Sequence, residues 1–140
     1  MDSANPVEIA LAFVAKINAH DLDGIAALMT PDHVFIDSLG ATVRGAGQMR
    51  VGWKSYLAWF PHYAIEITQQ FSNGEMAGLF GKARGTYAVD GRLVRQNSWE
   101  IPAAWRALIR NGRVAEWQVY CDNDPVRKIM AANSRAKPAS

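Results

Sequence analysis

Hydrophobic residues in the N-terminal part of the chain recur every three or four positions, which is the period of an α-helix. Ile9, Phe13 and Ile17 form one such stripe, and Asn5 stands where it can cap the helix that carries them. The same period continues in two later segments, and Pro61 ends the last of them, because the residue before a proline avoids helical geometry. We therefore predict three N-terminal helices: one after Asn5, a short one capped by Asp21, and one from Gly45 to Phe60.

From Tyr63 onward, hydrophobic and polar residues alternate, which is the period of a half-buried strand. Asn-Gly or Asp-Gly pairs divide this region, and such pairs favour hairpin turns because both residues tolerate positive φ. Pro102 lies inside the third strand and predicts a bulge or bend there. The predicted turns are Asn73-Gly74, Asp90-Gly91 and Asn111-Gly112, and they separate strands at Tyr63–Ser72, Met76–Val89, Leu93–Arg110 and Val114–Asp122.

Helices followed by a meander of long strands predict an α+β fold. Because long antiparallel strands twist and curl, we expect a cone-shaped, curved antiparallel sheet wrapped around the three N-terminal helices, with an internal pocket at the open end. We expect a single domain over residues 1–132. Residues 133–140 are small and polar, which predicts a flexible C-terminal tail.

Asp37 is a charged residue in an otherwise apolar, strand-like segment, Val34–Gly40. A carboxylate among apolar residues is costly unless it is paired, hydrogen-bonded or hydrated in a pocket. Carboxylates in such surroundings suit general bases. Asp37 therefore predicts an acidic group that faces an apolar cavity. The alternative is that Asp37 only caps the turn that follows it, as aspartate often does.

Composition and charge exclude several classes of protein. A net charge of +2 over 140 residues, with scattered arginines, does not indicate nucleic-acid binding. The chain has no apolar segment long enough to cross a bilayer and no signal peptide, so we predict no membrane association. A single cysteine, Cys121, fits a reducing compartment, and we expect a cytoplasmic protein. The three histidines lack metal-ligand spacing, and we expect neither a metal site nor a cofactor.

The order of the elements resembles the nuclear transport factor 2-like superfamily over nearly the whole chain. Within it, the segment Met29–Gly40 resembles the aspartate motif of ketosteroid isomerases, with Asp37 at its second aspartate. The segment Gly112–Asp122 resembles the closing motif of SnoaL-like polyketide cyclases and limonene epoxide hydrolases. The second motif is widespread, so it supports the fold more than the chemistry.

The resemblance implies acid–base catalysis by Asp37 and Asp122. Asp37 matches the proton-shuttling carboxylate of the isomerases, and Asp122 matches an acid–base aspartate of the cyclases. Asp122 could instead cap a final helix that begins near Pro125. Phe13 and Ala104 stand where the isomerases place the two hydrogen-bond donors of their oxyanion hole, and neither side chain can donate.

The resemblance and the aromatic content also suggest a set of ligand-binding residues. Gly81 and Ala83 stand where the epoxide hydrolases carry an Arg-x-Asp pair, so that reaction is not supported. Tryptophans are more often core residues than ligand platforms, and Glu100 could be a pocket carboxylate or a surface charge. The candidate ligand-binding residues are Phe13, Trp53, Tyr56, Phe60, Glu100, Trp117 and Tyr120.

Three functional hypotheses remain open. The first is a cofactor-independent enzyme, of the isomerase, cyclase or lyase type, that moves a proton on a hydrophobic carbonyl compound with Asp37 and Asp122. The second is a non-catalytic domain that binds a small hydrophobic molecule, and the third is a structural dimer. We expect a homodimer in any case, because Trp99 and Trp105 lie on a wide apolar strand face that could be either core or interface.

Overall fold

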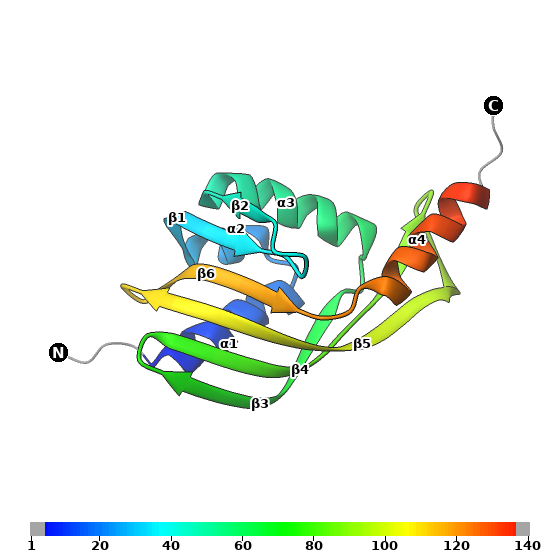
Figure 1. The fold of residues 1–140 in the computed structure, drawn as a ribbon. Coiled ribbons are helices and arrows are strands. Elements are labelled where there is room, and N and C mark those ends of the chain that lie inside the picture. Colours follow the sequence, from blue (N-terminus) through cyan, green and yellow to red (C-terminus); the bar gives the residue numbers. More distant parts are fainter. Residues whose placement is uncertain (1–4, 137–140) are drawn as a thin grey trace.

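The computed structural model describes residues 5–136, which form a six-stranded mixed sheet and four helices (Figure 1). The elements in chain order are α1 (Pro6–Asn18), α2 (Leu22–Ala27), β1 (Met29–Ile36), β2 (Thr42–Arg44), α3 (Ala46–Trp59), β3 (Ala64–Asn73), β4 (Met76–Val89), β5 (Arg92–Arg110), β6 (Arg113–Tyr120) and α4 (Asp124–Ala136).

The strands lie in the order β2-β1-β6-β5-β4-β3, and all neighbours are antiparallel except β1 and β6. β4 and β5 are the longest strands, with 14 and 19 residues, and the far end of their hairpin extends beyond the other strands (Figure 1). The sheet is curved and unclosed. Four helices with a mostly antiparallel sheet confirm the predicted α+β fold class. The parallel β1–β6 pair was not predicted, and it makes the sheet mixed.

The predicted capping residues begin the first two helices. The side chain of Asn5 accepts a hydrogen bond from the backbone N–H of Val7 at 2.9 Å, and Asp21 accepts one from Gly24 at 2.9 Å. The three predicted hairpin turns are also present. Gly74, Asp90 and Asn111 have φ values of 62°, 52° and 55°, which is the geometry that made these residues turn signals.

The inner face of the sheet packs against α1, and this decides between core and interface, the two roles left open for the face of Trp99 and Trp105. Trp99 and Trp105 point to this face and are only 8% and 2% exposed. They belong to the core together with Phe13 and Ile17 of α1. The Trp99 and Trp105 face is therefore not available as a dimer interface, because the helices already cover it.

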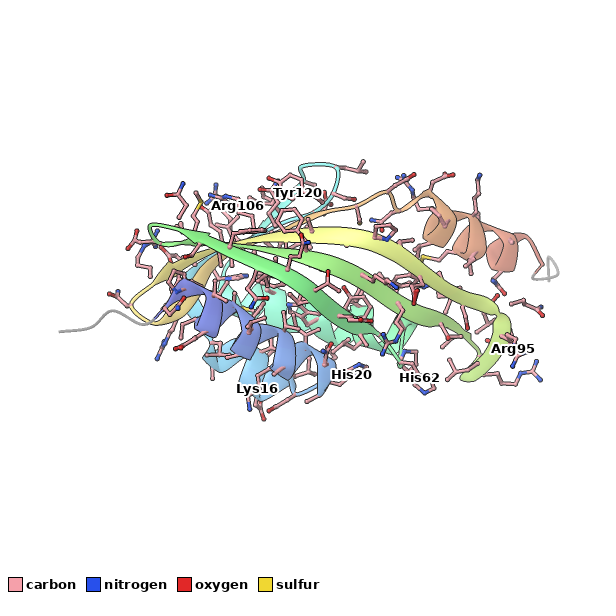
Figure 2. The ribbon with its side chains drawn as sticks, turned by 90° about the horizontal axis from the view of Figure 1, so that it is seen from below. Lys16, His20, His62, Arg95, Arg106 and Tyr120 are labelled. Atoms are coloured by element: carbon pink, nitrogen blue, oxygen red, sulfur yellow. The ribbon has the colours of Figure 1, made fainter. Side chains whose placement is uncertain are left out.

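The opposite, outer face of the sheet carries a row of exposed aromatic residues. Phe71, Phe80 and Tyr120 are 60%, 45% and 51% exposed, and the rings of Phe71 and Phe80 lie 5.8 Å apart. The register places Phe80 opposite Ala104, and Ala104 opposite Tyr120. Figure 2 shows Tyr120 on the side of the sheet away from α1.

A bulge in β3, at the edge of the sheet, interrupts the β3–β4 ladder. The register between β3 and β4 shifts between Ile67 and Gln69. The shift brings the β3 backbone so close to Gly81 that a Cβ there would lie 1.8 Å from the carbonyl oxygen of Glu66. The prediction of a bulge at Pro102 is wrong. Pro102 pairs regularly with Lys82 and lies beyond the end of the β5–β6 pairing, where a missing N–H is tolerated.

Helix α4 packs on the inner side of the extended β4–β5 hairpin. Asn133 donates to the side chain of Asn97 at 3.1 Å, and Asn97 donates to the carbonyl oxygen of Tyr87 at 3.3 Å. The segment 133–136, which was predicted to be tail, is the last part of this helix, and residues 137–140 lie outside the described residues. Across residues 5–136, the helices are too short or too polar to cross a membrane.

Gly81→Ala should lower the free energy of unfolding by about 2–3 kcal/mol, because the new Cβ collides with backbone that only a change of register can move. Gly78→Ala is the matched control in the same strand, since its Cβ would meet only the Phe80 ring at 3.7 Å. Urea unfolding of both variants measures the difference. Equal free energies of unfolding for the two variants would show that the β3 bulge accommodates a side chain at position 81.

Candidate functional site

Seven aromatic side chains gather on the inner side of the sheet near α4. We call them the aromatic cluster: Trp53, Tyr56, Trp59, Phe60, Tyr63, Tyr87 and Trp99. The rings of Tyr56 and Phe60 lie 4.9 Å apart, and those of Tyr56 and Tyr63 lie 5.0 Å apart and are nearly perpendicular. Several contacts have this edge-to-face geometry, which aromatic pairs favour. The cluster contains three predicted ligand-binding residues, Trp53, Tyr56 and Phe60.

Helix α3 and the chain directly after it supply most of these rings. Trp53, Tyr56 and Phe60 follow at helical spacing and so face the sheet together. Tyr63 is held from the other side, since the imidazole of His20 bonds to its carbonyl oxygen at 2.9 Å. The amide side chain of Asn18 exchanges two hydrogen bonds with the backbone of Ile65, at 2.8 and 2.9 Å. The end of α1 therefore fixes the start of β3.

The hydroxyl groups of Tyr56 and Tyr63 remain protonated at neutral pH. Burial raises the pKa of the Tyr63 phenol far above its usual range, and the nearby Tyr56 and Cys121 raise it further. Burial also raises the pKa of Tyr56, with a further contribution from Cys121. Both phenols are thus neutral hydrogen-bond donors. Sequence reasoning placed Tyr63 only in a strand, because its proximity to Tyr56 depends on the turn after α3.

Cys121 lies beside these tyrosines and joins a short hydrogen-bond chain. Its thiol donates to the Asn123 side chain at 3.3 Å, and Asn123 donates to the hydroxyl of Ser38 at 3.0 Å. Burial raises the pKa of the Cys121 thiol, so the group is neutral and weakly nucleophilic. This series of hydrogen bonds connects the segment after β6 to the turn after β1.

The two predicted catalytic carboxylates lie in these two joined segments, which we call the rim, and both accept backbone hydrogen bonds. Oδ1 of Asp37 accepts from the N–H groups of Leu39 and Ala41, each at 2.9 Å. Oδ1 of Asp122 accepts from the N–H of Asp124 at the start of α4, also at 2.9 Å. Asp37 therefore fills the turn role that was its alternative to catalysis, whereas Asp122 bonds the first N–H of α4 from the position before the N-cap, Asn123. Their catalytic roles remain predictions.

The remaining predicted site residues lie elsewhere. Phe13 and Trp117 are fully buried and pack edge to face at 4.9 Å in the core. Tyr120 is on the outer face, away from the cluster (Figure 2). Glu100 is also on the outer face, half-exposed, and pairs with Lys82 at 3.7 Å. The structure thus brings together only part of the predicted ligand-binding set.

Two shallow hollows lie at the surface near Glu100. The larger, of about 410 Å³, lies where β3 begins and is lined by residues that include His62, Gly85, Trp99 and Glu100. The smaller, of about 290 Å³, lies over the β3 bulge. Neither includes Asp37, so an apolar pocket around that residue remains a prediction. Within residues 5–136, no three His, Cys, Asp or Glu side chains are grouped as a metal site would need.

His33 is a buried polar residue that sequence reasoning did not place in a site. It is 0% exposed, and its Nδ1 lies 2.7 Å from the carbonyl oxygen of Val114, to which it donates. Its Nε2 has no hydrogen-bond partner among the described residues. The contact bridges a stretch where the β1–β6 register shifts between Met29 and Val34. The sequence feature that could have identified His33 is a histidine at a strand position that faces the core.

Comparison with known proteins agrees with this architecture. The family model for the SnoaL-like domain matches residues 10–117. No curated protein sequence matches the chain. The structure is similar to a protein of ketosteroid isomerase-like fold from Catenulispora acidiphila, solved in complex with trimethylamine, with a TM-score of 0.76, 19% identity, and coverage of 94% of this chain and 98% of that one.

Two proposed polyketide cyclases have similar structures. The SnoaL-like protein of Shewanella denitrificans has a TM-score of 0.75 and 14% identity, and the match covers 94% of this chain and 98% of the other. IdmH of Streptomyces antibioticus has a TM-score of 0.75 and 19% identity, with coverage of 91% and 99%. Identities this low show a shared fold.

The free energy of unfolding should fall as the pH drops below about 6.5. Burial lowers the pKa of His33, so the unfolded chain takes up a proton near pH 6.5 while the folded chain does not. Protonation then favours the unfolded state, by up to about 1.4 kcal/mol per pH unit, until the folded His33 is also protonated. Urea unfolding between about pH 7.5 and 5.5 measures this loss.

His33→Gln should reduce that pH dependence, whereas His62→Gln, at an exposed site, should leave it unchanged. An identical pH dependence in wild type and His33→Gln would show that His33 does not contribute to it.

Proposed function

The chain belongs to the SnoaL-like domain family, and on that premise we propose that it binds a small hydrophobic molecule at the aromatic cluster. The observation that carries this proposal is the pair of phenols, Tyr63 buried and Tyr56 partly buried, set among aromatic walls. Ligand sites of small molecules are typically apolar and aromatic, with a few polar groups that orient the ligand. The cluster combines these two properties.

A second candidate is acid–base catalysis on a carbonyl compound, with Asp37 as the base and Asp122 as the acid or a second base. One observation favours it. The hydrogen bond between Ser38 and Asn123 joins the two segments that carry these carboxylates, so both lie at one rim beside Cys121. Their backbone bonds engage Oδ1, and we assign proton transfer to the other oxygen of each carboxylate.

A homodimer formed through the outer face of the sheet is part of the proposal. Phe71, Phe80 and Tyr120 provide an apolar row. Beside it, Glu66 pairs with Arg84 and Lys82 pairs with Glu100, both at 3.7 Å, so the charges alternate and are balanced. A face of this kind is complementary to a second copy of itself. Light scattering of wild type and Phe80→Glu tests this, and a wild-type monomer would contradict it.

Ligand binding can be measured with 1-indanone, a small aromatic ketone, and indane, its hydrocarbon analogue. Wild type should bind both, and Tyr56→Leu should weaken binding about 10-fold, because it removes a ring that contacts four others in the cluster. Phe71→Leu, on the outer face, is the control and should bind like wild type. Absence of binding to either probe would contradict the proposed function.

Catalysis can be measured as exchange of the α-protons of 1-indanone with deuterated water. Asp37→Asn should reduce the enzyme-dependent exchange by a factor on the order of 10²–10⁴, which is the usual contribution of a general base. The amide oxygen of asparagine can still accept from Leu39 and Ala41, so the free energy of unfolding should change by at most about 1 kcal/mol. Unchanged exchange in this variant would assign Asp37 to the turn alone.

A further inference from the structure

Two buried indole N–H groups have no acceptor. Trp53 and Trp99 are 6% and 8% exposed, and neither Nε1 atom has a hydrogen-bond partner among the described residues. An indole nitrogen can only donate. A buried donor without a partner costs about 1–3 kcal/mol. Folded proteins seldom carry such a cost without a function for it, and a bound ligand or water is a common reason.

Both indoles belong to one group of contacts around Tyr63. The ring centroid of Trp53 lies 6.4 Å from that of Tyr63, and the centroid of Trp99 lies 6.1 Å from it. Trp53 comes from α3 and Trp99 from β5, so the two donors approach from a helix and from the sheet. A molecule held against Tyr63 would therefore have a donor within reach on either side.

The edge of Trp99 that carries the N–H group packs directly on the backbone of Gly85. A Cβ at Gly85 would lie 2.9 Å from Cζ2 and 3.3 Å from Cε2 of Trp99, and Cε2 is bonded to Nε1. Gly85 and Trp99 both line the hollow of about 410 Å³ at the start of β3. The absence of a side chain at position 85 therefore makes room for this edge of the indole, and it places the edge beside the residues that line the hollow.

The polar groups of the cluster are suited to an acceptor and not to a cation. The indole nitrogens are donors, and the phenols of Tyr56 and Tyr63 remain protonated. The predicted carboxylates Asp37 and Asp122 lie at the rim and bond to backbone N–H groups. Glu100 pairs with a lysine on the outer face. Among the described residues, the cluster thus holds no anion that would neutralise a bound cation.

We infer that Trp53 and Trp99 are the hydrogen-bond donors of this site, and that its ligand presents an acceptor oxygen, as ketones and quinones do. The inference rests on the proposed function and specifies its chemistry. Phe13 and Ala104 cannot donate hydrogen bonds, and the two indoles supply that capacity from other positions. The alternative is a cationic amine held by the aromatic faces. The trimethylamine bound to the Catenulispora protein makes this alternative worth testing.

Indole N–H signals in ¹H–¹⁵N spectra of the wild-type protein test the inference directly. Trp53→Phe, Trp59→Phe and Trp99→Phe assign the signals, because each variant lacks one peak. Addition of 1-indanone should move the Trp53 and Trp99 signals downfield, since their N–H groups gain an acceptor. Indane should move them much less. The signal of Trp59, which is half-exposed in the same cluster, should change little with either probe.

Affinities provide the second measurement. Trp53→Phe and Trp99→Phe keep an aromatic ring but lose the donor, so each should weaken 1-indanone binding about 3- to 10-fold, the usual worth of one neutral hydrogen bond. Indane affinity should change by a smaller factor, and Trp59→Phe should preserve the preference for indanone. If one variant does not fold, the wild-type shifts and the other variant still decide the outcome.

The possible results separate the two proposals. Equal affinity for 1-indanone and indane, with no downfield shift of either indole signal, would overturn the inference but leave hydrophobic binding intact. Tighter binding of trimethylamine than of 1-indanone would also overturn it, in favour of a cation site. Failure of both indanone and indane to bind would contradict the proposed function itself, and the inference with it.

Discussion

The regular alternation of side chains along β5 is the constraint on which the rest of this structure depends. From Asn97 to Ile109 every second residue is buried, and the residues between them face outward. A shift of one residue would exchange the two faces completely. Because the inner face carries Trp99 and Trp105, this register decides where α1 and α3 pack. It also determines that the outer face presents Phe80 and Tyr120 through its pairing with β4 and β6.

The polar groups of the site are divided between a buried interior and a rim. In the interior, burial keeps Tyr56, Tyr63 and Cys121 protonated. At the rim, Asp37 and Asp122 are near water and bond to backbone N–H groups. Ionised carboxylates are costly in an apolar interior, whereas neutral donors can be buried at a smaller cost. The arrangement therefore separates groups that can orient a ligand from groups that can exchange protons with solvent.

Local signals allowed much of the fold to be predicted. Asn5 and Asp21 cap helices, and Asp90 and Asn111 form hairpin turns, because each of these roles depends on a few neighbouring residues. The parallel β1–β6 pair could not be predicted in this way. It depends on packing between segments far apart in the chain, and the register shift bridged by His33 has no local signature.

The candidate site was less predictable for the same reason. The resemblance and the aromatic content were sufficient to select Trp53 and Tyr56, which do lie together. Tyr63 and Trp99 join them only through the curvature of the sheet, so their spacing in the sequence does not indicate the contact. Asp37 stands out in an apolar segment, but an isolated aspartate before a turn fits two roles equally well. The backbone bonds to Leu39 and Ala41 can be seen only in the structure.

The parallel pairing of β1 with β6 has a consequence for how the chain folds. The strands β3 to β6 follow one another through short turns, so that their contacts form between near neighbours. The bond from His33 to Val114 instead spans 81 residues. Closing so long a segment costs chain entropy before any pairing compensates for it. This one contact region therefore contributes heavily to the contact order, the property that most strongly slows folding in small domains.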